Sequence, residues 1–150
     1  MELETLKQWM SGAGLDGKED SDGFLLVARG NMEISVSYLK EADLVVCFAP
    51  LLELSVLDDA QRLEALSQAL ALNGVGALPP CCALSLDEEA DVVYLLWQQS
   101  PERLDAAGFE KAFDEFATAA AQVQGHLRGQ LAESDGAGNG RDAQDNLIKV

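Results

Sequence analysis

Hydrophobic and polar residues alternate most regularly over residues 32–38, where Met, Ile, Val and Tyr are separated by Glu and two Ser. Such alternation is typical of a strand with one buried face. Shorter apolar runs at residues 24–28 and 44–48 lie on either side of it, next to tight turns. These three segments predict an antiparallel meander, and Pro50 is expected to end the third strand or place it at an edge.

Two further strands are predicted over residues 82–86 and 92–97, because an acidic turn at residues 87–91 separates two apolar runs. The second of these strands has apolar residues on both faces, which indicates that both faces are covered. The charged segment 16–22 lacks large apolar residues and is predicted to be a solvated loop.

Three helices are predicted from apolar residues at helical spacing. The first is short and amphipathic and ends near Gly12. The second begins at Asp58 or Asp59, which suit an N-cap and a first turn, and ends at Asn73. The third begins after Asp105 and carries three phenylalanines on one stripe. The order is α-β-β-β-α-β-β-α, an α+β domain with a five-stranded antiparallel sheet and three helices.

The domain is expected to span residues 1–132. Residues 133–150 are rich in Gly, Asp, Ser and Asn, and they predict a flexible C-terminal tail.

Charge narrows the choice of partner. The chain has 26 acidic and 10 basic residues and a net charge of −16, so nucleic acid and anionic membrane surfaces are poor partners. The longest uncharged run, residues 65–86, is interrupted by Asn, Gly and two Pro, and the first residues do not form a signal peptide. We therefore expect a cytoplasmic protein without membrane insertion.

The sequence offers little for catalysis. Cys47, Cys81 and Cys82 cannot all pair within one chain, and adjacent cysteines with a single histidine, His126, do not match zinc spacing. No triad or phosphate-binding glycine loop is apparent. These observations predict no enzyme activity, no metal, no cofactor and no small-molecule substrate. An exposed apolar patch or a free sheet edge remains as the means of binding a partner.

At this point the chain resembles the class I chaperones of bacterial type III secretion, the Tir-chaperone (CesT-like) family. The resemblance covers residues 3–131 and rests on the order of elements, the size and the acidity. It also rests on short segments, namely Phe48-Ala49-Pro50-Leu51, the helix end at Asn73, Leu84-Ser85-Leu86-Asp87, and Leu104-Asp105 before Phe109, Phe113 and Phe116. Leu52 stands where the family often has glycine.

The resemblance implies a homodimer that binds the N-terminal chaperone-binding segment of a secreted effector and keeps it competent for secretion without ATP. It implies that the second helix and the last two strands form the dimer interface, with Leu66, Leu70, Leu84 and Trp97. It further implies that the first helix and first three strands contact the client, with Leu3, Leu6, Trp9, Met10, Leu25, Val27 and Phe48.

Two alternatives remain open. One is a regulatory protein of the same fold that sequesters an activator or another chaperone. The other is an acidic immunity or inhibitor protein that masks a basic enzyme surface, whose binding should weaken steeply with salt.

Overall fold

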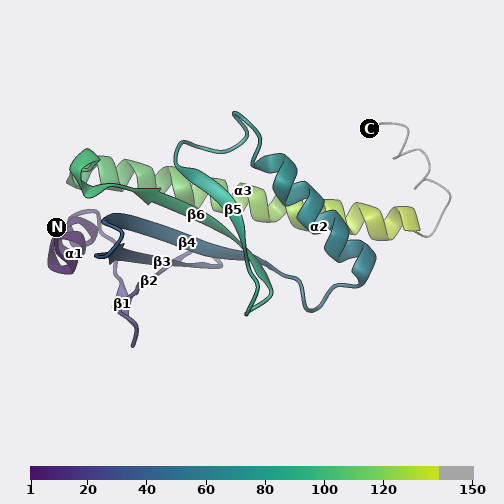
Figure 1. Cartoon of the computed structure of the whole chain (residues 1–150), viewed down its shortest axis with the longest axis horizontal. Helices are drawn as coiled ribbons and strands as arrows, with labels where there is room; N and C mark the ends of the chain where they lie inside the picture. Colours follow the sequence, from purple (N-terminus) through teal and green to yellow (C-terminus); the bar gives the residue numbers. More distant parts are fainter. Residues whose placement is uncertain (139–150) are drawn as a thin grey trace.

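Six strands form one antiparallel sheet in the order β1-β2-β3-β4-β6-β5 (Figure 1). The computed structural model describes residues 1–138, and the side chains of residues 1–132. The strands are β1 Lys18–Glu19, β2 Leu25–Arg29, β3 Met32–Leu39, β4 Leu44–Glu53, β5 Cys82–Asp87 and β6 Val92–Gln99. The helices are α1 Leu3–Gly12, α2 Asp59–Leu72 and α3 Ala106–Gly138, and a 3-10 turn spans Pro101–Arg103.

The predicted fold class and element order are confirmed, with one strand more than expected. The additional strand is β1, which pairs Lys18 with Leu26 and Glu19 with Leu25 inside the segment predicted to be a loop. Two exposed polar residues give no alternation that a sequence pattern could reveal. A second difference is that β4 continues past Pro50 to Glu53, because a shift in register between Pro50 and Leu52 accommodates the missing N–H donor.

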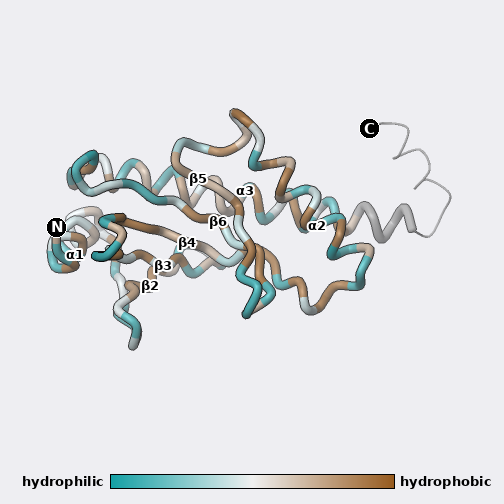
Figure 2. The backbone as a smooth tube through the Cα atoms, viewed as in Figure 1, coloured by the Kyte–Doolittle hydropathy of each residue, from teal (hydrophilic) through white to brown (hydrophobic). Residues whose placement is uncertain are grey.

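One face of the sheet carries the hydrophobic core. Alternate residues of β3, namely Met32, Ile34 and Val36, are buried there. Helix α3 packs against β4, and α1 packs against α3 and β3. Hydrophobic residues concentrate in the strands and helices, whereas the turn between β5 and β6 is hydrophilic (Figure 2). This face is therefore covered by the chain's own helices.

Two aromatic residues join α1 to α3. The rings of Trp9 and Phe109 lie 6.1 Å apart, and Phe109 is fully buried. Phe113 and Phe116 follow on the same stripe of α3 and are also buried, as the helical spacing predicts.

Helix α2 lies beside the sheet and crosses α3 (Figure 1). It begins with a capping box, in which the Asp58 side chain accepts from Gln61 N at 2.8 Å and the Gln61 side chain accepts from Asp58 N at 3.1 Å. Its small residues Ala65 and Ala69 are buried, since α2 packs against α3 and β5.

The third helix is longer than the sequence indicates. It reaches Gly138, so residues 133–138 of the predicted tail are helical. The rest of that predicted tail, residues 139–150, lies outside the described residues. Within residues 1–138, no helix combines the length and the apolar character needed to cross a bilayer.

Candidate functional site

The sheet face turned away from α1 and α3 contains a hollow of about 640 Å³. Strand register builds it, because residues directly opposite one another point to the same side. Phe48 of β4 lies opposite Leu96 of β6 on one side and opposite Ser35 of β3 on the other. Pro50 lies opposite Tyr94 in the same way. These residues are half-buried or exposed, so the centre of this face is apolar and accessible.

An aromatic row runs across the hollow. The ring of Phe48 lies 5.3 Å from that of Phe24 and 6.1 Å from that of Tyr94, with interplanar angles of 76° and 66°. Edge-to-face contacts of this kind favour fixed ring positions. Phe48 is the middle member and contacts both neighbours.

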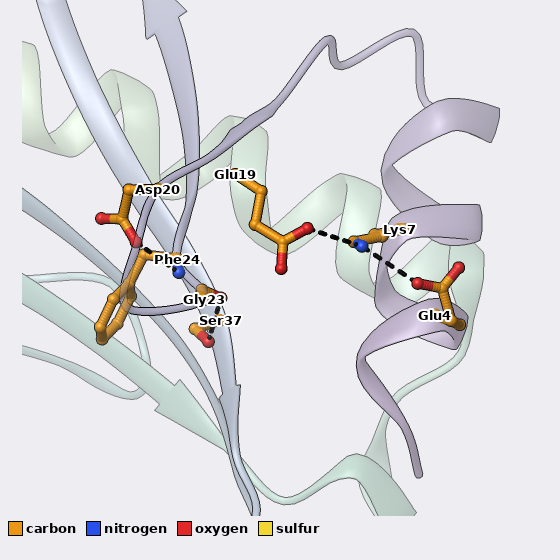
Figure 3. Close-up of polar contacts among 7 residues, drawn as sticks. All are labelled: Glu4, Lys7, Glu19, Asp20, Gly23, Phe24 and Ser37. Carbon is orange, nitrogen blue, oxygen red and sulfur yellow. Dashed lines mark hydrogen bonds and ion pairs between the residues drawn. The ribbon is translucent and has the colours of Figure 1, made fainter.

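The turn before β2 fixes the position of Phe24 (Figure 3). Asp20 Oδ1 accepts from Phe24 N at 3.0 Å and from Asp22 N at 2.8 Å. The hydroxyl of Ser37 on β3 donates to the carbonyl of Gly23 at 3.2 Å. Gly23 has φ +83°, a conformation that favours glycine. The first ring of the aromatic row is thus held by a structured turn.

Charge at the hollow is negative. Glu33 and Asp87 contribute to its lining, and no Lys or Arg is among the described residues that line it. An apolar floor with an acidic margin suits a partner segment that combines apolar side chains with basic ones.

The structure separates the residues predicted to contact a client into three groups. Phe48 lies in the hollow, where Phe24, Tyr94 and Leu96 join it. Leu3 and Trp9 are half-buried on α1 and pack against the core. The remaining four are buried within the single subunit; these are Leu6, Met10, Leu25 and Val27.

The sequence could not distinguish these groups, because a periodic stripe of apolar residues indicates that a face is buried but not whether the same chain or a partner buries it. Met10 and Leu25 belong to elements that the chain's own packing covers in this conformation. Phe24, Tyr94 and Leu96 were missed by the sequence reasoning. The signal that could have found Tyr94 and Leu96 was β6 itself, whose two apolar faces were recognised but not assigned to a binding surface.

The residues predicted for the dimer interface also fall into two groups, which differ in their exposure. Leu84 and Trp97 are 6% and 5% exposed and belong to the core of a single subunit, so neither forms an open surface. Leu66 is half-buried, whereas Leu70 on α2 is 73% exposed. Leu63, which was not predicted, is 68% exposed. Because seven residues make nearly two helical turns, Leu63 and Leu70 lie on the same side of α2.

Two of the three thiols, those of Cys47 and Cys82, are poor candidates for nucleophiles. Burial raises the pKa of Cys47 far above its usual range, and it raises the pKa of Cys82 to about 11. The thiolate is the reactive form, so both side chains are largely protonated at neutral pH. Within the described residues no three potential metal ligands come together.

Solved structures with this fold include complexes of chaperones. The HopA1–SchA chaperone–effector complex contains a chain of 12% identity and TM-score 0.60, with 81% of this chain and 91% of that chain covered. The ExoT–SpcS complex from Pseudomonas aeruginosa contains a chain of 20% identity and TM-score 0.57, with 79% of this chain and 92% of that chain covered. YbjN from E. coli has 14% identity and a TM-score of 0.69, with 87% of this chain and 93% of that chain covered. At sequence identities this low, the similarity shows that these chains share a fold and nothing further.

A search of curated proteins found no match. A family model, that of the Tir chaperone protein (CesT) family, matches residues 5–124, which is most of the chain. The chain therefore belongs to the Tir chaperone protein (CesT) family.

Proposed function

We propose that this protein is a type III secretion chaperone that binds the N-terminal segment of a secreted effector and keeps it in a non-globular, secretion-competent form. Family membership supports the role, and similarity to chains from chaperone–effector complexes is consistent with it. The observation that carries the proposal is the accessible aromatic row of Phe24, Phe48 and Tyr94 in an acidic-rimmed hollow. Binding needs neither a nucleotide nor a catalytic step, because burial of apolar side chains supplies the free energy.

In this proposal the client places apolar side chains on the aromatic row, with Phe48 as the central contact. Truncation of an aromatic anchor in a binding hot spot typically costs ~2 kcal/mol or more. Basic residues of the client would lie near Glu33 and Asp87. Leu3 and Trp9 on α1 are proposed as a second, smaller contact, because both keep part of their surface exposed.

We further propose that the protein acts as a homodimer in the bacterial cytoplasm. Leu63 and Leu70 form an exposed apolar stripe on α2, and stripes of this kind usually mark an interface. Pairing two copies through α2 would cover the stripe and present two hollows to one client segment.

The test is capture followed by titration. Tagged protein is used to recover partners from the bacterium that encodes it, the partners are identified by mass spectrometry, and the N-terminal segment of the main partner is purified. We expect this segment to bind without ATP, with an affinity that falls less than about tenfold between 0.1 and 1 M salt, since apolar contacts are not screened. Binding only by a folded domain, or a much steeper loss with salt, would favour the inhibitor alternative.

A further inference from the structure

The two adjacent cysteines, Cys81 and Cys82, lie where β5 begins and β6 ends. Cys82 of β5 is directly opposite Trp97 of β6, so these two side chains point to the same side of the sheet. Trp97 is buried, which makes this the side that carries the core. The Cys82 side chain therefore lies on the core side of the outer strand.

The backbone at Cys81 brings the second thiol to the same side. In a regular strand neighbouring side chains point to opposite faces, so Cys81 would face away from Cys82. Cys81 instead has φ +66°, a left-handed conformation that is uncommon for residues other than glycine. Gln99 Nε2 donates to Cys81 Sγ at 3.5 Å, and Gln99 follows Trp97 by two residues in β6, so it shares the core side. The Cys81 sulfur therefore lies on the core side as well.

Two further hydrogen bonds hold this arrangement. Gln98 N donates to Cys81 O at 3.3 Å, which fixes the backbone of Cys81 against β6. Ser100 N donates to Gln99 Oε1 at 3.2 Å, so the oxygen of that amide is occupied and its nitrogen is turned toward Cys81. The position of Cys81 Sγ is thus set by the fold, although the side chain is exposed.

The two thiols lie close enough to affect one another. Burial raises the pKa of Cys82 to about 11, and the Cys81 thiol and the Glu115 carboxylate of α3 add to that effect. The third thiol, Cys47 on β4, lies opposite Trp97 on its other side. Strand β6 and Trp97 separate Cys47 from Cys82, so Cys47 is not part of the pair.

An ion from solvent can reach this pair. Cys81 is exposed, and a cavity of about 670 Å³ lies beside it, lined by Pro79 and Pro80 just before Cys81 and by Glu115 and Ala119 of α3. The net charge of −16 favours the approach of a cation over that of an anion.

We propose that Cys81 and Cys82 form a two-thiolate site for a soft monovalent cation, Cu(I). Thiolates are ligands that Cu(I) prefers, and two of them complete a linear coordination. A structural Zn²⁺ site needs four ligands, whereas the described residues contain no group of three or more Cys, His, Asp or Glu that could hold a metal. Binding forms two Cu–S bonds and releases two thiol protons to solvent, with no change in oxidation state.

The site and the hollow lie on opposite faces of the sheet. Cys82 shares the side of Trp97, whereas Tyr94 and Leu96 of β6 line the hollow. A bound ion would therefore leave the aromatic row free, and this inference does not depend on the proposed function.

The test is an anaerobic titration of the full chain with Cu(I) against a coloured Cu(I) chelator. We expect one ion per chain, release of about two protons per ion at neutral pH, and loss of the fast reaction of Cys81 with a disulfide reagent. The proton count reports on the number of thiols without any substitution. Release of a single proton, or one ion shared by two chains, would overturn the proposal, because neither result fits two thiolates from one chain.

Variants of the three cysteines locate the site. Cys81→Ser and Cys82→Ser should each weaken Cu(I) binding at least about 100-fold, because a hydroxyl is a poor ligand for a soft ion. Cys47→Ala is the control and should bind as the natural chain does, and the melting temperature of each variant is measured alongside. Cys81 is exposed, so its substitution by serine leaves the core intact. Tight binding by Cys81→Ser, or by a folded Cys82→Ser variant, would overturn the proposal.

Gln99 should act as a positioning residue for Cys81. Gln99→Ala removes the donor to Cys81 Sγ and should weaken Cu(I) binding about tenfold, as the loss of a hydrogen bond to a metal ligand typically does. Gln98→Ala is the matched control, since Gln98 is the neighbouring residue on the opposite face and keeps its backbone bond to Cys81. Equal affinities of these two variants for Cu(I) would contradict a site built by the fold.

Discussion

Asn73 pairs with the backbone of Leu84 as a neighbouring strand would. Asn73 Nδ2 donates to Leu84 O at 2.9 Å, and Leu84 N donates to Asn73 Oδ1 at 2.7 Å. The side chain that ends α2 therefore occupies both backbone groups of Leu84 on β5 and ties this helix to the sheet. The two ends of the sheet are thus protected differently, because β5 is held by α2 whereas the other end is the two-residue strand β1 beside β2.

Replacing Asn73 with alanine should destabilise the fold. Two hydrogen bonds are lost and the groups of Leu84 must be satisfied by water, which predicts a loss of ~1–2 kcal/mol. For a domain of this size, ~1 kcal/mol corresponds to about 4 °C in the melting temperature. Thermal and urea unfolding measure the change. Ser67→Ala, an exposed change on the same helix, serves as control; an equal effect of both variants would mean that the pairing does not matter.

The ion pair of Arg62 and Asp91 should make the free energy of unfolding depend on pH in the acidic range. Arg62 Nη1 lies 2.6 Å from Asp91 Oδ2, and this hydrogen bond lowers the pKa of Asp91. Its contribution to folding is fully present above the unfolded pKa of about 3.9 and is lost as the pH falls through the lower folded value.

The variant Asp91→Asn tests this dependence, because asparagine tolerates the φ of +58° at this position. The difference in unfolding free energy between the natural chain and the variant should shrink when urea titrations are moved from pH 6 to pH 3. A difference that stays constant over this range would show that the carboxylate charge contributes nothing.

The three thiols should react in a fixed order. Cys81 is exposed, Cys82 is half-buried with a pKa raised to about 11, and Cys47 is buried with a strongly raised pKa. Because reaction needs an accessible thiolate, a disulfide reagent should modify one thiol quickly in the native protein and all three after unfolding. Cys81→Ser should remove the fast phase; persistence of that phase would show that Cys82 or Cys47 becomes accessible.

The proposed dimer can be tested on α2. Light scattering should give twice the chain mass of 16.0 kDa at micromolar concentration. Leu70→Lys should shift the protein toward monomer, because it places a charge in the exposed apolar stripe. Val75→Lys is the matched control, since Val75 is fully exposed outside the helix. A natural chain that measures as a monomer would contradict the homodimer.

The sequence predicted which segments become strands and helices because periodicity depends on local geometry. It could not predict β1, whose two polar residues carry no pattern. It also could not tell whether Met10 and Leu25 face the chain's own segments or a partner, since both demand an apolar side chain. The apolar residues on both faces of β6 predicted that both faces are covered, whereas in the subunit only one face is buried and the other lines the hollow.

Phe48 allows the most direct test of the account, because it is the middle ring of the aromatic row and also the one predicted client residue in the hollow. The measurement is the affinity of the captured effector segment for the natural chain, for Phe48→Ala and for the control Val75→Ala, with the melting temperature of each. We expect Phe48→Ala to weaken binding at least about tenfold, since ~1.4 kcal/mol corresponds to one decade, while Val75→Ala binds normally and both variants stay folded. Binding by a folded Phe48→Ala variant within about twofold of the natural chain would contradict the central claim that the hollow holds the client.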